Sequence, residues 1–86
     1  MSTVRLPRML SETAGVGGRH EVTGETVGEA LDHLFERAPG LRNHVLDESG
    51  VIRPHVSVFV DGEQADLETE VGPASEIRIL HAVSGG

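Results

Sequence analysis

The final segment of the sequence, Ala82-Val83-Ser84-Gly85-Gly86, is the feature best suited to carry chemistry. Two consecutive glycines have no side-chain bulk and allow backbone conformations that other residues rarely adopt, so a carboxylate on Gly86 can be threaded into a narrow site on another protein. We expect residues 81–86 to form a flexible tail in which Gly86 is the reactive end and the four residues before it thread into a partner. Chain ends are often small and functionless, so this interpretation depends on the elements that precede the tail.

The side chains with catalytic or metal-binding chemistry do not form a recognisable site. The histidines include no His-x-x-x-His pair and fall on different predicted elements, so we expect them to be solvated or locally hydrogen-bonded and predict no metal site. Ser84 has no base held beside it and is not predicted to be a nucleophile. We therefore expect no catalytic residue in this chain. The histidines are His20, His33, His44, His55 and His81.

The composition excludes several classes of chemistry. The 86 residues include no Cys, and all seven basic residues are Arg, so the chain offers no disulfide, thiolate zinc site, iron–sulfur cluster, cysteine nucleophile or Schiff-base lysine. The net charge of -7 argues against nucleic acid and anionic membranes as partners and favours a protein with a basic surface. No signal peptide or membrane span is recognisable, and we expect a cytoplasmic protein.

The first part of the chain is predicted to form two strands. Residues 3–10 alternate apolar and polar side chains, which is typical of a half-buried strand. Pro7 cannot donate a hydrogen bond to a neighbouring strand, so this strand should bulge, end or lie at an edge near that residue. The glycine-rich residues 15–18 predict a turn, and residues 19–23 predict a returning strand. Together these segments predict an N-terminal hairpin.

One helix is strongly indicated after this hairpin. Thr26 and Glu29 have the spacing of a capping box, in which both side chains satisfy free amides at a helix start. The apolar residues that follow recur with the spacing of a single buried helix face, and Pro39-Gly40 predicts its end. One further helical turn is predicted around residues 41–46. The predicted buried face comprises Val27, Ala30, Leu31, Leu34, Phe35 and Ala38.

The second half of the chain predicts three more strands. Residues 55–60 alternate strongly and lead through Asp61-Gly62, a tight-turn signal, into a short strand at residues 63–65. Residues 76–81 predict the last strand. One helix cannot cover both faces of four or five strands, so the expected fold is α+β, a mixed sheet with one main helix packed on one face. This order of elements is the β-grasp (ubiquitin-like) arrangement, here as a single domain spanning residues 1–86.

These features together resemble the MoaD/ThiS family of ubiquitin-like sulfur-carrier proteins, in particular its longer MoaD-like or CysO-like type. The resemblance rests on the element order, the strand 56–60 with its Asp61-Gly62 turn, the strand 77–80 and the Gly-Gly tail, and it covers essentially the whole chain. It implies that an E1-like adenylyltransferase/sulfurtransferase adenylates the Gly86 carboxylate. Conversion of the adenylate to a thiocarboxylate would then allow sulfur donation to a biosynthetic enzyme. ATP and Mg²⁺ would belong to the activating enzyme, so this chain would be a carrier with no cofactor of its own and not an enzyme.

A docking patch is predicted on the outer face of the last strand. If Ile77 and Ile79 point to the core, the two-residue period of a strand places Leu80 on the other face. The same rule places Phe59 outward, and with Pro7 these side chains are predicted to form an apolar patch near the tail. In the family that this chain resembles, the corresponding sheet face contacts both activating and acceptor enzymes.

Two alternatives and the acceptor pathway remain open at the level of sequence. The chain could be a ubiquitin-like modifier joined through Gly86 to a lysine amine, or a β-grasp interaction domain with an inert tail. The extra segment 41–54 and the segment 53–63 favour molybdopterin or cysteine biosynthesis over thiamin or specialised-metabolite pathways. A separate acidic run is expected to be a solvated loop able to steer a basic partner. It comprises Glu63, Asp66, Glu68 and Glu70.

Overall fold

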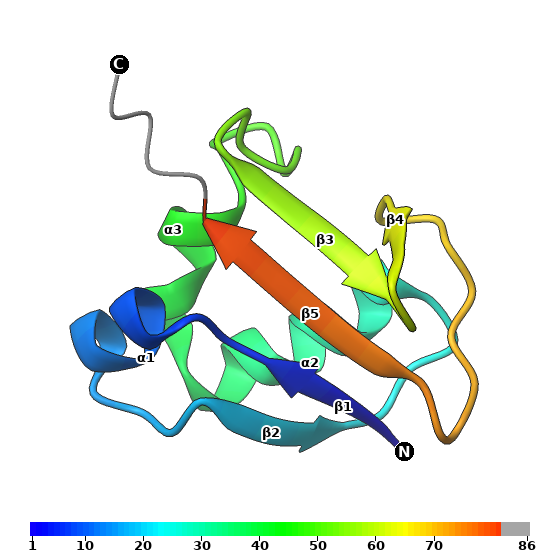
Figure 1. Cartoon of the computed structure of the whole chain (residues 1–86). Helices are drawn as coiled ribbons and strands as arrows, with labels where there is room; N and C mark the ends of the chain where they lie inside the picture. Colours follow the sequence, from blue (N-terminus) through cyan, green and yellow to red (C-terminus); the bar gives the residue numbers. More distant parts are fainter. Residues whose placement is uncertain (82–86) are drawn as a thin grey trace.

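The computed structural model describes residues 1–81, which form a five-stranded mixed sheet with the longest helix across one face (Figure 1). The strands are β1 Ser2–Arg5, β2 Arg19–Val22, β3 Val56–Val60, β4 Glu63–Ala65 and β5 Glu76–His81. The helices are α1 Arg8–Ala14, α2 Val27–Arg37, α3 Arg42–Val45 and the 3₁₀ turn η1 Pro39–Leu41. No helix in this part of the chain is long and apolar enough to cross a membrane.

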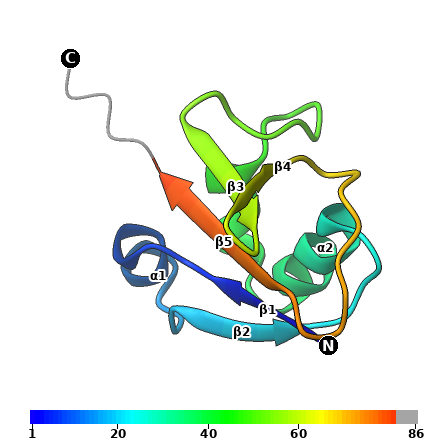
Figure 2. The ribbon, with the colours of Figure 1, turned by 45° about the vertical axis from the view of Figure 1, so that its right-hand side comes forward.

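The sheet places the last strand at its centre. Its strand order is β2-β1-β5-β3-β4, with β5 parallel to β1 and antiparallel to β3. The outer strands β2 and β4 run antiparallel to their neighbours. Figures 1 and 2 show α2 lying across one face of this sheet, while the opposite face carries no helix. The predicted α+β, β-grasp architecture is confirmed.

The core between α2 and the sheet is almost entirely aliphatic. Its single aromatic member is Phe35, and every residue of the predicted helix face is buried. The inward residues of β3 and β5 complete it, as the strand alternation predicted. The buried hydrophobic residues are Val4, Leu6, Leu10, Val22, Val27, Ala30, Leu31, Leu34, Phe35, Ala38, Leu41, Val45, Leu46, Val56, Val58, Ile77 and Ile79.

The start of α2 confirms the predicted cap, with one difference. The Glu29 N–H donates to the Thr26 hydroxyl at 3.2 Å, as in a capping box. The Glu29 carboxylate, however, accepts from the Glu25 N–H at 2.9 Å, one residue earlier than the standard pattern. Both groups still satisfy backbone amides at the helix start, so the sequence signal located α2 correctly.

The prediction of a strand through residue 10 is wrong beyond Arg5. Pro7 has φ -66° and ψ 152°, and its carbonyl accepts from the N–H groups of Leu10 and Ser11, which begin α1 at Arg8. Leu6 and Leu10 are both buried. Their spacing of four residues fits the period of a helix and also that of a strand. Pro7 thus ends the strand. β1 does not lie at an edge of the sheet. It is antiparallel to β2, and the connection between them contains α1 instead of a tight hairpin turn.

Candidate functional site

The strand that leads to the predicted tail is the central strand of the sheet. β5 is paired on both sides, and its inward residues Ile77 and Ile79 are completely buried. It ends at the side of the sheet opposite the N-terminus (Figure 1). The predicted reactive and threading residues, Ala82, Val83, Ser84, Gly85 and Gly86, lie outside the described residues. The structure therefore defines the rigid support of the candidate site.

The outward side chains of β3 and β5 form a shallow depression on the open sheet face. Its volume is about 360 Å³. Leu80 is 42% exposed, and Phe59 is partly buried. Because Phe59 pairs with Arg78 and Ser57 pairs with Leu80, the two apolar side chains are diagonal neighbours on one face. The described residues that line the depression are Phe59, Gly62, Glu76, Arg78 and Leu80.

Two of the three residues of the predicted docking patch line this depression. Phe59 and Leu80 share the depression, as the strand alternation predicted. Pro7 is not among the residues that line it and instead precedes the first residue of α1. Its place follows from the end of β1 at Arg5, which the sequence prediction extended too far. We therefore define the open sheet face by Arg5, Phe59, Glu76, Arg78 and Leu80.

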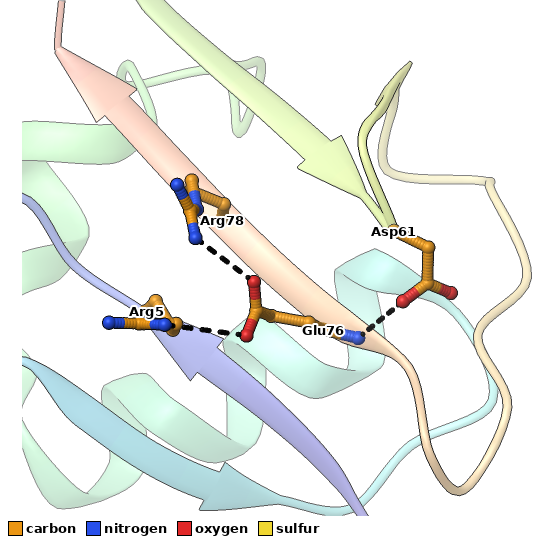
Figure 3. Close-up of polar contacts among 4 residues, drawn as sticks. All are labelled: Arg5, Asp61, Glu76 and Arg78. Carbon is orange, nitrogen blue, oxygen red and sulfur yellow. Dashed lines mark hydrogen bonds and ion pairs between the residues drawn. The ribbon is translucent and has the colours of Figure 1, made fainter.

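An ion-pair network crosses this face beside Leu80 (Figure 3). Glu76 lies between two arginines, with Oε1 3.2 Å from Arg78 Nη2 and Oε2 3.6 Å from Arg5 Nη1. All three side chains are about half exposed, so each pair contributes at most about 1 kcal/mol to stability. The network orients the charges around the apolar residues. The alternation that places Leu80 outward also places Arg78 outward, but the contact of Glu76 with Arg5 depends on the pairing of β1 with β5.

The Asp61-Gly62 turn is tied to the start of β5. Both residues have positive φ, 50° and 89°, as expected for a tight hairpin turn whose twist matches the strands. The Asp61 carboxylate accepts from the Glu76 N–H at 2.9 Å (Figure 3), and the Asp61 N–H donates to the Glu76 carbonyl at 2.9 Å. The turn therefore fixes one end of the open sheet face.

A pair of histidine rings lies where β5 ends. His81 pairs across the sheet with Val56, and this brings the rings of His55 and His81 edge to face with their centroids 4.6 Å apart. His20 and His33 make the predicted local hydrogen bonds, to the Gly17 carbonyl and from the Thr23 N–H. Within residues 1–81, no group of three His, Asp or Glu side chains is placed to hold a metal ion.

Comparisons with known proteins agree with this geometry. The ThiS family model matches residues 4–86. Small archaeal modifier protein 1 of Haloferax volcanii is 33% identical over 92% of this chain and 97% of its own length. Sulfur carrier protein CysO of Mycobacterium tuberculosis is 27% identical over 98% of this chain and 97% of its own length.

Solved structures give the same result. The crystal structure of the Haloferax volcanii modifier matches with a TM-score of 0.84 and 34% identity, covering 99% of this chain and 98% of that chain. A chain of the Amycolatopsis orientalis BexX/CysO complex matches with a TM-score of 0.89 and 30% identity, covering 100% of both chains. Members of this family are small carrier proteins rather than enzymes. The chain, with its β-grasp sheet and its match through Gly86, belongs to the ThiS/MoaD family of ubiquitin-like sulfur carriers.

Proposed function

We propose that this protein is a sulfur carrier whose Gly86 carboxylate is converted to a thiocarboxylate. The observation that carries the proposal is the extent of the family match, which includes both the anchored strand β5 and Gly86. The CysO relative, named a sulfur carrier protein, aligns over 98% of this chain. The proposed reactive group is thus supplied by the main chain, in agreement with a sequence that contains neither Cys nor Lys.

The proposed chemistry has two steps. The carboxylate of Gly86 attacks the α-phosphate of ATP on an activating enzyme, and pyrophosphate leaves. A sulfur nucleophile at the oxidation level of sulfide then attacks the acyl carbon, and AMP leaves to give the thiocarboxylate. A free carboxylate is a poor electrophile because it is anionic and resonance-stabilised, and the adenylate removes this obstacle. ATP, Mg²⁺ and the sulfur source belong to the partner in this proposal, and this chain is the cosubstrate.

We further propose that the activating enzyme and the sulfur-accepting enzyme both dock on the open sheet face. Leu80 is exposed one residue before β5 ends, so a partner that covers it also lies next to the start of the tail. An exposed apolar residue rimmed by charged groups is typical of a protein-binding surface. Glu76 pairs with both Arg5 and Arg78, so one positive charge among these three side chains remains for an acidic group of a partner to meet.

Intact-mass spectrometry tests the sulfur-carrier proposal. The purified chain is incubated with ATP, Mg²⁺, a sulfide source and an activating enzyme of this family. We expect the mass gain of one oxygen replaced by one sulfur, located at Gly86 by fragmentation. A chain lacking Gly85 and Gly86 is the control and should fold normally but gain no mass. Repeated failure to form either adenylate or thiocarboxylate with an enzyme that activates another family member would overturn the proposal.

A second candidate function is protein modification through Gly86. It is favoured by the relative named small archaeal modifier protein 1. In this reaction a lysine amine of a target attacks the activated Gly86 carbonyl and forms an isopeptide bond. The chain itself has no lysine, so it cannot accept Gly86 on a lysine side chain of another copy.

The remnant left by trypsin distinguishes the two functions. The last Arg of the chain is Arg78, so trypsin would leave residues 79–86 attached to each modified lysine. Detection of this eight-residue remnant on target lysines would establish modification, and its absence from cells that contain the thiocarboxylate would leave the carrier function alone. For the sulfur acceptor, the CysO relatives favour the cysteine-type pathway over the molybdopterin type.

A further inference from the structure

A second surface lies between the loop at residues 50–52 and the loop at residues 66–68. These segments line a groove of about 350 Å³ that shares no described residue with the depression on the open sheet face. Neither the tail chemistry nor docking on the open sheet face uses it. We call it the acidic groove. Its lining residues are Gly50, Val51, Ile52, Asp66, Leu67 and Glu68.

The floor of the acidic groove is apolar and firmly held. Val51 is 57% exposed, more than any other large hydrophobic residue within residues 2–81. Ile52 and Leu67 are partly buried and pack against the core. Ile52 forms a bridge with Leu46, and the Leu67 carbonyl accepts from the Gly28 N–H of α2 at 2.9 Å. The groove is therefore attached to the rigid part of the fold on both sides.

The rim of the groove carries uncompensated negative charge. Asp66 and Glu68 are exposed, and Oδ1 of Asp66 is fixed by the Glu68 N–H at 2.9 Å and the Thr69 hydroxyl at 3.1 Å. Asp47 and Glu48 continue the acidic surface beyond Gly50, where the Arg53 charge lies near Asp47. The ion pairs found within residues 1–81 involve other residues, Arg5, Arg8 and Arg78 with Glu12 and Glu76.

We propose that the acidic groove docks a basic segment of a partner protein that presents an aliphatic side chain between cationic ones. The aliphatic side chain would cover Val51 and Leu67, while Arg or Lys groups would meet the acidic rim. Phosphate-bearing ligands are repelled by this rim. A second copy of the chain would bring a net charge of -7 to a surface that is itself acidic. Charge complementarity thus selects a basic polypeptide.

This location has a functional consequence. Because the acidic groove and the open sheet face share no described lining residue, one partner segment can hold the protein while an enzyme occupies the open face and the tail. Two weak contacts made by linked segments bind together more tightly than either alone, since the second contact forms within the complex. The groove would then raise the fraction of this protein that is bound to the enzyme carrying the basic segment.

Amide NMR on the full isotope-labelled chain tests the proposal. The probe is the peptide acetyl-Arg-Leu-Arg-Leu-Arg-amide, compared with acetyl-Arg-Ser-Arg-Ser-Arg-amide and acetyl-Glu-Leu-Glu-Leu-Glu-amide. We expect saturable shifts at residues 50–52 and 66–68 with the first peptide and much weaker shifts with the other two. Equal shifts with the serine peptide, shifts confined to the open sheet face, or no saturation would overturn the proposal. Peptide-independent shifts at the groove that grow with protein concentration would assign it to a second copy instead, and would also overturn it.

Variants separate the apolar and charged contributions. Val51→Ser should weaken binding of the leucine peptide about fivefold, because it removes most of the exposed apolar floor. Glu68→Lys should weaken it about threefold and reduce its sensitivity to salt. Met9→Ser is the matched control, since Met9 is a similarly exposed apolar residue on α1, and should leave the affinity unchanged. An equal loss in all three variants would contradict docking in the groove. Thiocarboxylation is measured on the unmodified chain, so failure there and failure of peptide binding are separate results.

Discussion

The open sheet face and the acidic groove expose apolar side chains in two different electrostatic settings. On the open sheet face, Leu80 lies beside a glutamate that is paired with two arginines. At the groove, Val51 lies beside acids that have no ion-pair partner among residues 1–81. One positive charge is left over in the network of Arg5, Glu76 and Arg78, whereas the groove carries the negative charges of Asp66 and Glu68. The two surfaces of this small domain therefore favour partner groups of opposite charge.

The two surfaces also differ in how firmly the core supports them, and this gives the largest expected effect. Ile79 is completely buried beneath the open sheet face, whereas Val51 is mostly exposed. Ile79→Ala should lower the free energy of unfolding by about 3 kcal/mol, because it leaves a cavity in a packed core. Val51→Ala should change it by less than about 0.5 kcal/mol. Urea unfolding followed by circular dichroism measures both, and similar losses would show that the loop is as tightly packed as β5.

Leu80 should dominate activation by the proposed partner enzyme. Leu80→Asp places a charge in the apolar part of the open sheet face and should lower the rate of Gly86 adenylation about 30-fold, the effect of losing a central contact residue. Met9→Asp is the control, because Met9 is 44% exposed and Leu80 is 42% exposed but Met9 lies on α1. Both variants should unfold at the temperature of the unmodified chain. If Leu80→Asp is adenylated at the same rate as the unmodified chain, Leu80 is not part of the docking surface.

The sequence predicted those elements whose signals are local. The cap at Thr26, the apolar helix face and the Asp61-Gly62 turn each lie within a few residues, and the structure confirms all three. The alternation in β5 likewise located Leu80 on the outer face. Residues 8–10, which begin α1, were predicted to be strand because a short apolar pattern around Pro7 fits both periods. Only the packing of Leu10 into the core decides between them.

The features missed by the sequence analysis depend on long-range pairing. Glu76 meets Arg5 because β1 and β5 are parallel neighbours, and no local pattern contains this pairing. The His55–His81 contact depends on the β3–β5 register in the same way. Residues 50–52 and residues 66–68 together line the acidic groove, although β3 and β4 separate them in the sequence. The acidic run was recognised as a surface able to steer a basic partner, but its apolar floor required the fold.

The ion-pair network on the open sheet face offers a smaller test. Glu76→Gln removes the contacts with both Arg5 and Arg78 and should cost less than about 1 kcal/mol of stability, because all three groups are half exposed. Glu12→Gln is the control, since it removes one exposed pair with Arg8 on α1. Thermal unfolding at low and high salt should show a larger, salt-sensitive loss for Glu76→Gln. A loss of thermal stability no larger than that of Glu12→Gln would mean that the ion-pair network does not stabilise the open sheet face.

The smallest expected effect is an acid-sensitive loop beside the groove. The Val51 N–H donates to the Asp47 carboxylate at 3.0 Å and the Ser49 N–H donates to it at 2.8 Å. The bond from Val51 and, after it, the bond from Ser49 and the nearby Arg53 charge hold the pKa of Asp47 below its ordinary value of 3.8. Ionised Asp47 therefore supports the loop at any pH above 3.8, and this support is lost as the pH falls through the lowered pKa.

Amide NMR during an acid titration measures this effect. The Val51 and Ser49 amide shifts should change together with a midpoint below 3.8, and their hydrogen exchange should become faster relative to that of β5 once Asp47 is protonated. In Asp47→Asn the pH-dependent step should disappear while the fold of β3 and β5 persists. A midpoint at or above 3.8 would show that these hydrogen bonds do not favour the ionised carboxylate. The side of the groove formed by Val51 would then be held in place by the Leu46–Ile52 bridge and its packing on the core instead of by charge.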